Sequence, residues 1–357
     1  MLLLAYILCL NMNAQVKREI IIPDICGFMT LKCDFHSHTV FSDGTVWPTV
    51  RVDEAWREGL DALSLTEHIE YRPHKKYITE GRHDQSYEIA KPYANDNNII
   101  LIKGSEISRS MAPGHFNAIF LEDCNELDQK DWREAFKAAK KQNAFIFWNH
   151  PGWARQQPDT TLWWKEHTDI YNNGWMQGIE VANGGSYFPE AHRWCLDKNL
   201  TMLGNSDIHQ PIGMDYNFYK GEHRTMTFVL VKERTIEGIR EALDNHRTLV
   251  YIKDLVIGKE EFIKDLFEKS VKVTNIKRNK NNCQITLQNN SDLKFELTKS
   301  KHNMEIEYFR TFTINPQSRC VNNIYYPEGF ANKGEINFKV SNLLVRPNEG
   351  LEYSYSF

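Results

Sequence analysis

Short apolar runs alternate with amphipathic segments from about residue 31 to residue 256. The apolar runs predict buried strands at residues 31–36, 61–66, 99–104, 116–121, 144–148, 178–182, 201–204 and 225–231. Pro48 and Gly59 mark the start and end of a predicted helix over residues 46–59, and helical spacing predicts two more over 131–141 and 235–245. Strands and helices that alternate at these lengths indicate an α/β fold with a mostly parallel sheet, which suits a barrel better than an open sheet.

The pattern changes near residue 256. Residues 255–270 predict one further helix, and the chain then continues as short alternating runs at 271–276, 283–287, 294–298, 304–312, 335–340 and 351–357. Turn-forming residues such as Asn332-Lys333-Gly334 separate some of these runs. We therefore expect a barrel domain over residues 15–256 and a small, sandwich-like antiparallel β domain over residues 257–357.

The first residues differ from both regions. Met1 to Leu10 is apolar and leads into the polar stretch 11–15, so residues 1–14 are expected to be a signal peptide, although no basic residue precedes the apolar run. The run is too short to span a bilayer, and no other stretch suits a transmembrane helix. Export, into the periplasm, is therefore expected, with a cytoplasmic location as the alternative.

Composition excludes several classes of function. The 357 residues are 41% hydrophobic and 25% charged, which is a balance typical of folded globular proteins. The net charge of −4 gives no sign of a nucleic-acid partner. The seven cysteines form no Cys-x-x-Cys pair, so a thiolate zinc site is not expected.

Candidate chemistry begins at the end of the first predicted strand. His36 and His38 are two residues apart, so in a strand they share one face, about 6–7 Å apart, and could hold one divalent metal. The simpler interpretation is a pair of polar residues where a strand meets a loop. Ligand-type residues, however, also end other strands: Glu67-His68, Glu106, His150, and Asp207 with His209, while His115 opens one. Functional side chains of parallel α/β barrels gather at the carboxyl ends of the strands, so this recurrence favours a metal site over chance.

Residues 31–251 resemble the polymerase-and-histidinol-phosphatase (PHP) superfamily of metal-dependent phosphoesterases. The motifs that carry the resemblance are, in order, Asp34-Phe35-His36-Ser37-His38-Thr39 with Ser42-Asp43-Gly44, Leu65-Thr66-Glu67-His68, Gly104-Ser105-Glu106-Ile107-Ser108, Asn149-His150-Pro151-Gly152 and Asn205-Ser206-Asp207-Ile208-His209. The family often has Thr-Asp-His where this chain has Thr66-Glu67-His68, which leaves the histidine unchanged. The resemblance implies a distorted (β/α)7 TIM-like barrel with a di- or trinuclear metal centre, and it leaves the leader and the last hundred residues uncovered.

By position, the resemblance also implies the ligands of three metals. These are His36, His38, Glu106 and Asp207 for the first, Glu106, His115 and His150 for the second, and Asp43, His68 and His209 for the third. Asp43-Gly44 could instead be an ordinary turn, and His83 is a rival of His115 but lies in a polar loop. The catalytic roles would fall to Glu106, Asp207 and His209.

Other residues near these motifs allow two interpretations. Arg109 and Arg155 could bind a phosphate oxygen, or they could be surface arginines. The tryptophans could line a pocket for the leaving group or belong to the core or rim: Trp153, Trp163 and Trp164. The remaining histidines match no motif and are expected on the surface or in packing: His74, His167, His192, His223, His246 and His302.

Imidazole and carboxylate ligands without thiolate suit Zn, Mn or Fe(II), so two to three such divalent ions are expected. A centre of this kind produces hydroxide near neutral pH and neutralises phosphoryl oxygens. We therefore expect a metal-dependent hydrolase of a small phosphomonoester or phosphodiester. A metal-dependent amidohydrolase also opens with His-x-His but usually supplies a bridging carboxylated lysine, and a non-catalytic binding protein should have lost ligands, so both alternatives fit less well. The sequence indicates neither the substrate nor the oligomeric state.

Overall fold

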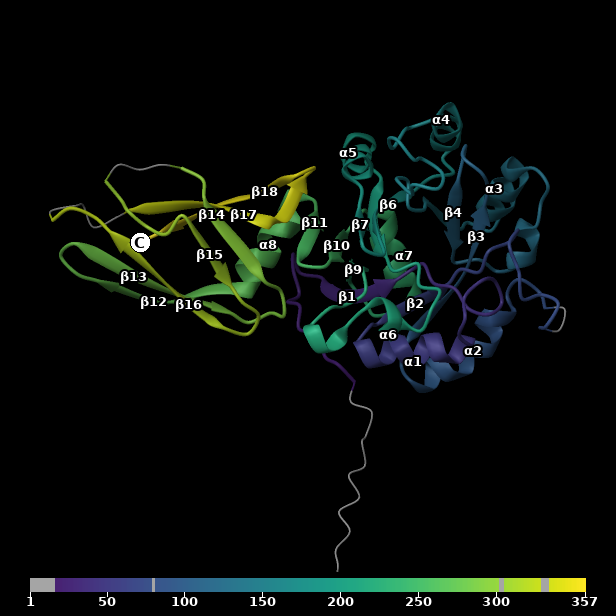
Figure 1. The fold of residues 1–357 in the computed structure, drawn as a ribbon, viewed down its shortest axis with the longest axis horizontal. Coiled ribbons are helices and arrows are strands. Elements are labelled where there is room, and N and C mark those ends of the chain that lie inside the picture. Colours follow the sequence, from purple (N-terminus) through teal and green to yellow (C-terminus); the bar gives the residue numbers. More distant parts are fainter. Residues whose placement is uncertain (1–16, 79–80, 302–304, 329–333) are drawn as a thin grey trace, which may run out of the picture.

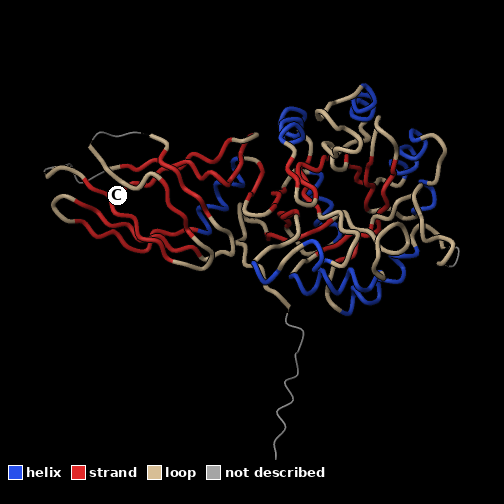
Figure 2. Tube along the Cα trace, viewed as in Figure 1, coloured by secondary structure: helices blue, strands red, loops and turns tan. Residues whose placement is uncertain are grey.

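The computed structural model describes residues 17–78, 81–301, 305–328 and 334–357. Two regions lie along the long axis of the molecule, one with helices around a sheet and one built almost entirely of strands (Figures 1 and 2). The predicted signal peptide falls outside the described residues. Within them, no helix has the length and apolar character needed to cross a membrane.

The first region contains every strand predicted before residue 232, with ends shifted by a few residues. Its elements are β1 (Met29–Asp34), α1 (Pro48–Glu58), β2 (Ala62–Leu65), α2 (Gln85–Asp96), β3 (Ile100–Ser108), β4 (His115–Ile119), the 3-10 helix η1 (Cys124–Leu127), α3 (Trp132–Lys141), β5 (Phe145–Trp148), α4 (Lys165–Asn172), β6 (Gly178–Asn183), β7 (Ser186–Tyr187), α5 (Pro189–Lys198), β8 (Thr201–Asn205), α6 (Ile212–Asp215), η2 (Phe218–Lys220), β9 (Met226–Val231), α7 (Ile236–Asp244), β10 (Thr248–Ile252) and β11 (Leu255–Gly258). The three helices predicted over 46–59, 131–141 and 235–245 are α1, α3 and α7.

The sheet of this region mixes parallel and antiparallel strand pairs. Strands β1, β2 and β3 run parallel, as do β5, β6 and β8, and antiparallel β4 joins the two sets. Strand β9 pairs antiparallel with β1. The two ends of this series approach each other, because Ser37 forms an isolated bridge with Ile208 and the Thr227 hydroxyl bonds to both backbone groups of Gly204. No continuous ladder closes the sheet among the described strands, so the α/β prediction is confirmed and the closed barrel is not.

Helix α1 shows how local sequence sets the scaffold of the site. Pro48 occupies the first turn, where no backbone donor is needed, and Gly59 ends the helix with φ +82°. A Cβ on Gly59 would approach the Arg18 carbonyl oxygen to 2.3 Å. Both the positive φ and this close contact therefore require glycine at this position. Val52 and Ala55 are fully buried and pack in an apolar cluster with residues of β2 and α2. Helix α1 is thereby fixed against β2 and α2.

One predicted boundary was wrong. The helix expected over 255–270 begins only at Glu260 as α8 (Glu260–Ser270), because Leu255–Gly258 forms strand β11 beside β10. A short apolar run gives no periodicity that separates a buried strand from a buried helical turn. Strand β10 and helices α2, α4 and α5 were not anticipated either.

The second region is an antiparallel β structure, as predicted. Its strands are β12 (Val271–Arg278), β13 (Asn282–Asn289), β14 (Phe295–Lys299), β15 (Thr311–Ile314), β16 (Arg319–Tyr325), β17 (Glu335–Arg346) and β18 (Glu349–Ser356). Strands β12, β13 and β16 form one sheet, and β15, β14, β17 and β18 belong to the other. Residues 305–310 of the run expected at 304–312 lie outside β15, and residue 304 is not among the described ones. Alternate residues of β13 are buried, which gives its sheet an inward face.

The two regions share a sheet and a core. Strand β17 pairs in parallel with β11, through Val256 opposite Leu343. Phe228 of β9 packs in the same apolar cluster as Phe267 of α8 and Phe338 of β17. The β-rich region is therefore joined to the first region by continuous backbone pairing and by buried apolar surface.

Candidate metal centre

Ligand-type side chains from separate strand ends converge on the carboxylate of Glu106, which is fully buried at the end of β3. Oε2 of Glu106 lies 2.7 Å from Nδ1 of His68, 3.4 Å from Nε2 of His38 and 3.5 Å from Nε2 of His36. Oε1 lies 2.8 Å from Nδ1 of His115. One carboxylate therefore faces imidazoles from several strands, which is the arrangement expected of a ligand shared between metals.

The first group of ligand atoms comes from the ends of β1 and β8. Nε2 of His36 and Nε2 of His38 are 3.1 Å apart, and each lies 3.1 Å from Oδ1 of Asp207. These atoms lie close enough together for a single ion to contact all three residues. The two histidines do share one face, as the spacing in the sequence predicts.

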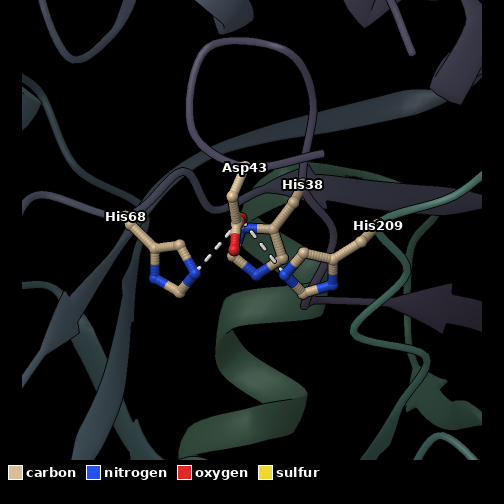
Figure 3. A group of neighbouring side chains, drawn as sticks. All are labelled: His38, Asp43, His68 and His209. Atoms are coloured by element: carbon tan, nitrogen blue, oxygen red, sulfur yellow. Dashed lines mark ion pairs between the residues drawn. The ribbon is translucent and has the colours of Figure 1, made fainter. Parts of the chain in front are cut away.

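A second group surrounds Asp43 (Figure 3). Oδ1 of Asp43 lies 3.1 Å from Nε2 of His209, 3.3 Å from Nε2 of His68 and 3.9 Å from Nδ1 of His38. A Cβ at Gly44 would come within 2.6 Å of the His38 backbone, so only glycine lets this loop fold back closely. The Asp-Gly pair thus makes a turn and also presents its carboxylate to the cluster.

A third group contains Glu106, His115 and His68. Nε2 of His150 is farther away, at 3.8 Å from Oε1 of Glu106 and 3.9 Å from Oδ2 of Asp207. In the structure, His68 therefore lies closer to Glu106 and His115 than His150 does. The rival residue His83 lies elsewhere, with Nε2 3.5 Å from Asp128.

The residues present fit divalent metal ions. Three buried ligand atoms make no hydrogen bond of good geometry, namely Asp43 Oδ1, Glu106 Oε2 and His115 Nδ1. A buried polar atom left unsatisfied costs about 1–3 kcal/mol, and coordination of a cation would remove that cost. The donor set is imidazole and carboxylate without thiolate, which suits Zn, Mn or Fe(II).

The electrostatics favour the metal-binding protonation state at two of the ligands, Glu106 and His38, whereas neighbouring carboxylates raise the pKa of His36, His68 and His209 despite their burial. Burial alone would raise the pKa of Glu106, but His68, His115 and His36 hold that pKa well below its usual range. Burial, together with the neighbouring His209 and His68, lowers the pKa of His38 to about 3. His38 is therefore neutral and Glu106 ionised at neutral pH, which are the forms that bind metals.

Two buried arginines brace the loops that carry these ligands. Arg51 of α1 donates to the backbone carbonyls of His38 at 2.8 Å, Ile208 at 3.2 Å and Gln210 at 2.8 Å. Arg224 donates at 2.9 Å to Asp34, whose carboxylate accepts hydrogen bonds from the backbone of Ser206 and from its hydroxyl. The first arginine thus fixes the His38 and His209 loops, and the second acts beside Asp207.

Sequence reasoning missed the residues behind the ligands. Nδ1 of His38 lies 3.2 Å from the Ser42 hydroxyl, which in turn donates to Glu67 at 2.5 Å. The glutamate that departs from the usual Thr-Asp-His pattern thus supports His38 through a serine. Asn149 donates to Oε1 of Glu106 at 3.0 Å. Glu180, in the apolar run of β6, was also missed, although an acid inside a predicted buried strand is itself a signal.

A cavity of about 850 Å³ opens over the cluster, and both candidate arginines line it. Arg109 is held in the wall, with Nε 2.7 Å from Glu70 and hydrogen bonds to two backbone carbonyls. Arg155 is exposed, lies over the ring of Trp153 at 5.7 Å, and has no ion pair with any residue that the structure describes. Arg155 is thus the more available of the two to a bound anion.

The aromatic side chains near the cluster also differ in whether they line the cavity. Trp153 and Tyr71 line the cavity. Trp163 packs against Trp148, and Trp164 is exposed outside the lining of the cavity. Of the unmatched histidines, His302 lies outside the described residues, and the others contact none of the ligands through an interaction found in the described chain.

Comparisons with known proteins indicate the family of this chain. The Ig-like domain family DUF5001 matches residues 270–356. A crystal structure of a two-domain protein from Bacteroides vulgatus, containing a predicted PHP-like metal-dependent phosphoesterase, is 57% identical, covers 96% of this chain and 100% of its own, and superposes with a TM-score of 0.94. An amidohydrolase from Chromobacterium violaceum is 18% identical over 51% of this chain and 89% of its own, with a TM-score of 0.41. A search of curated proteins gave no match.

The expected family is confirmed by the first of these structures. At 57% identity over 96% of the chain, the similarity includes the region of the metal centre and the β-rich region together. The second structure is too distant to carry an argument about fold or chemistry. The chain belongs to the PHP-like metal-dependent phosphoesterases.

Proposed function

We propose that the protein hydrolyses a small phosphomonoester or phosphodiester at a centre of two to three divalent metal ions. The observation that carries this proposal is the convergence of imidazoles and carboxylates on buried Glu106, at the floor of a cavity of about 850 Å³. The B. vulgatus relative contains a predicted phosphoesterase of the same kind.

The nitrogen atoms that face the cluster allow the ligands to be divided. His38 turns Nε2 to Asp207 while its Nδ1 is occupied by Ser42, so His38 belongs with His36 and Asp207. His68 presents Nε2 to Asp43 and Nδ1 to Glu106. This division favours one ion at His36, His38 and Asp207 and another at Asp43, His68 and His209, with Glu106, His115 and His150 available for a third.

Bound divalent ions would supply an acidified water and neutralise negative charge on the phosphoryl oxygens. Glu106 and Asp207 would hold the ions at a fixed separation. His209, partly exposed beside the carboxylates of Asp43 and Asp207, faces the cavity. Arg155 would bind a phosphoryl oxygen from the rim, because its guanidinium has no carboxylate partner among the described residues. Trp153 and Tyr71 would contact the leaving group.

The experiment is an assay of protein purified without chelator against chromogenic phosphomonoesters and phosphodiesters, with added Mn, Zn or Fe(II). His115→Ala should abolish hydrolysis, whereas His83→Ala is the matched control and should retain it, because His83 lies beside Asp128 and outside the cluster. Metal-loaded protein that cleaves cyclic amides and no phosphoester would favour the amidohydrolase alternative.

We also propose that residues 1–14 direct export. Amino-terminal sequencing of the mature protein from fractionated cells tests this directly. A mature chain that still begins at Met1 and fractionates with the cytoplasm would contradict it.

A further inference from the structure

Glu180 lies behind the metal centre on β6 and is fully buried. Oε1 accepts hydrogen bonds from Nδ1 of His36 at 2.9 Å and from Nδ2 of Asn205 at 2.9 Å. Oε2 accepts from the backbone N–H of His150 at 2.7 Å and from Nδ2 of Asn183 at 2.8 Å. All four neighbours donate, so the position suits a carboxylate, which only accepts when ionised.

The contact with His36 decides which nitrogen can bind a metal. Because the carboxylate accepts, the proton of a neutral His36 sits on Nδ1. Nε2 then carries the lone pair, and it points toward Oδ1 of Asp207 at 3.1 Å. A carboxylate behind a metal-binding imidazole fixes the ring orientation and makes the ring a stronger ligand.

The same carboxylate also reaches two other ligand-bearing segments. His150 has φ 29° and Asp207 has φ 53°, and such left-handed conformations are unfavourable for residues with a Cβ. The backbone N–H of His150 donates to Oε2 of Glu180. Nδ2 of Asn183 donates to the same oxygen and also to Oδ2 of Asp207, at 3.3 Å. Glu180 thus connects the ends of β1, β5 and β8.

We propose that Glu180 is a positioning residue, which aligns His36, His150 and Asp207 for a divalent cation. This inference rests on the metal centre of the proposed function. Glu180 is not part of the cavity lining, so it acts on metal binding and not on contacts with the substrate.

Glu180→Gln tests the inference, because the isosteric amide sets its own N–H groups against two of the four donors. Apo protein would be titrated calorimetrically with Zn²⁺ or Mn²⁺, and the absorption spectrum of the Co²⁺-loaded form recorded. We expect affinity to fall about 10–100-fold and the Co²⁺ spectrum to change. Glu180→Asp should restore part of the affinity, and KM for a phosphoester at saturating metal should stay unchanged.

Glu241→Gln is the matched control, because it breaks an ion pair between Glu241 on α7 and Arg247, away from the cluster. It should leave the metal affinity and the Co²⁺ spectrum as in wild type. If Glu180→Gln does not fold, Asn183→Ala removes one donor and should still weaken binding about tenfold, the lower limit for such partners.

The outcomes separate the two proposals. A folded Glu180→Gln variant with wild-type affinity and spectrum overturns this inference alone. If Asn183→Ala has to be used, wild-type affinity in that variant has the same consequence. Wild-type protein that binds no divalent metal overturns the proposed function, and this inference with it.

Discussion

The metal centre and the β-rich region both contain fully buried side chains, but these side chains differ in polarity. In the β-rich region most of the fully buried side chains are apolar, such as Phe295 and Phe338. At the metal centre the fully buried side chains include His36, His38 and Glu106. An apolar core stabilises the fold by itself, whereas a cluster of buried charges is stable only with partners and, we infer, with bound cations. The β-rich region therefore stabilises the fold, whereas the metal centre depends on the surrounding structure and on bound cations for its own stability.

The two regions are not separate bodies, because β11 and β17 pair and their apolar clusters merge. The comparison can nevertheless be tested by changing one region and measuring the other. A change at the metal centre should affect metal binding and turnover more than stability. A change in the β-rich core should do the reverse.

The largest effect is expected from Glu106→Gln. This substitution removes the charge that faces His68, His115, His38 and His36, so turnover should fall by more than about a hundredfold, the upper range for outer-sphere partners. Bound metal, measured by elemental analysis, should fall as well, while circular dichroism stays unchanged. Glu134→Gln, on the exposed side of α3, is the control and should behave as wild type. Wild-type turnover in folded Glu106→Gln would mean that Glu106 does not hold the ions.

The reverse experiment is Phe338→Ala in β17. Truncating a fully buried phenylalanine should lower the free energy of unfolding by about 3–5 kcal/mol, measured by denaturant titration. Metal content and turnover per folded molecule should not change, because the ligands all lie before residue 210. Loss of metal from a demonstrably folded variant would show that the β-rich region completes the site.

Removal of the metal should destabilise the first region more than the second. Ligands present at a hundred times Kd stabilise a fold by about 2.7 kcal/mol, so chelation should lower Tm, and added Zn or Mn should restore it. Hydrogen exchange would locate the loosening, which we expect at the ends of β1, β3 and β8. An unchanged Tm with demonstrably stripped protein would mean that the buried charges need no cation.

The sequence predicted the ligands more easily than their supports. His36, His38, Asp207 and His209 stand at strand ends, where two-residue spacing and barrel topology place side chains on one edge. Glu180 contacts His36 across 144 positions of chain, and Arg51 contacts Ile208 across 157, so neither pairing leaves a local pattern. Strand β11 was mistaken for helix because its four residues adjoin a true helix. Local periodicity therefore predicts elements and exposed edges, whereas buried polar pairing depends on the assembled fold.

The smallest effect is expected from His167, a histidine that packs in the core and does not face the metal centre. His167 follows the His150 motif in sequence but is part of the core, with its ring tilted by 30° against that of Trp148 and the ring centroids 3.7 Å apart. Its Nδ1 accepts a hydrogen bond from the backbone of Trp164 and its Nε2 donates to the Pro113 carbonyl, which only the neutral ring can do. Burial lowers the pKa of His167 to about 4. The unfolded chain takes up the proton near pH 6.5, so this contribution is complete above that pH and is lost as pH falls toward 4.

At pH 5 the loss from His167 should be about 2 kcal/mol relative to pH 7.5, at 1.36 kcal/mol for each unit of pKa difference. Urea titrations of wild type and His167→Gln between pH 5 and pH 7.5 isolate the contribution of His167 to the free energy of unfolding, because every other titrating group is common to both proteins. The stability difference between the two should shrink by that amount as pH falls, while His74→Gln, in a loop after β2, should follow wild type throughout. A difference that stays constant with pH would mean that the pKa of His167 is the same in the folded and the unfolded chain, and that the hydrogen bond from Trp164 does not hold its ring neutral.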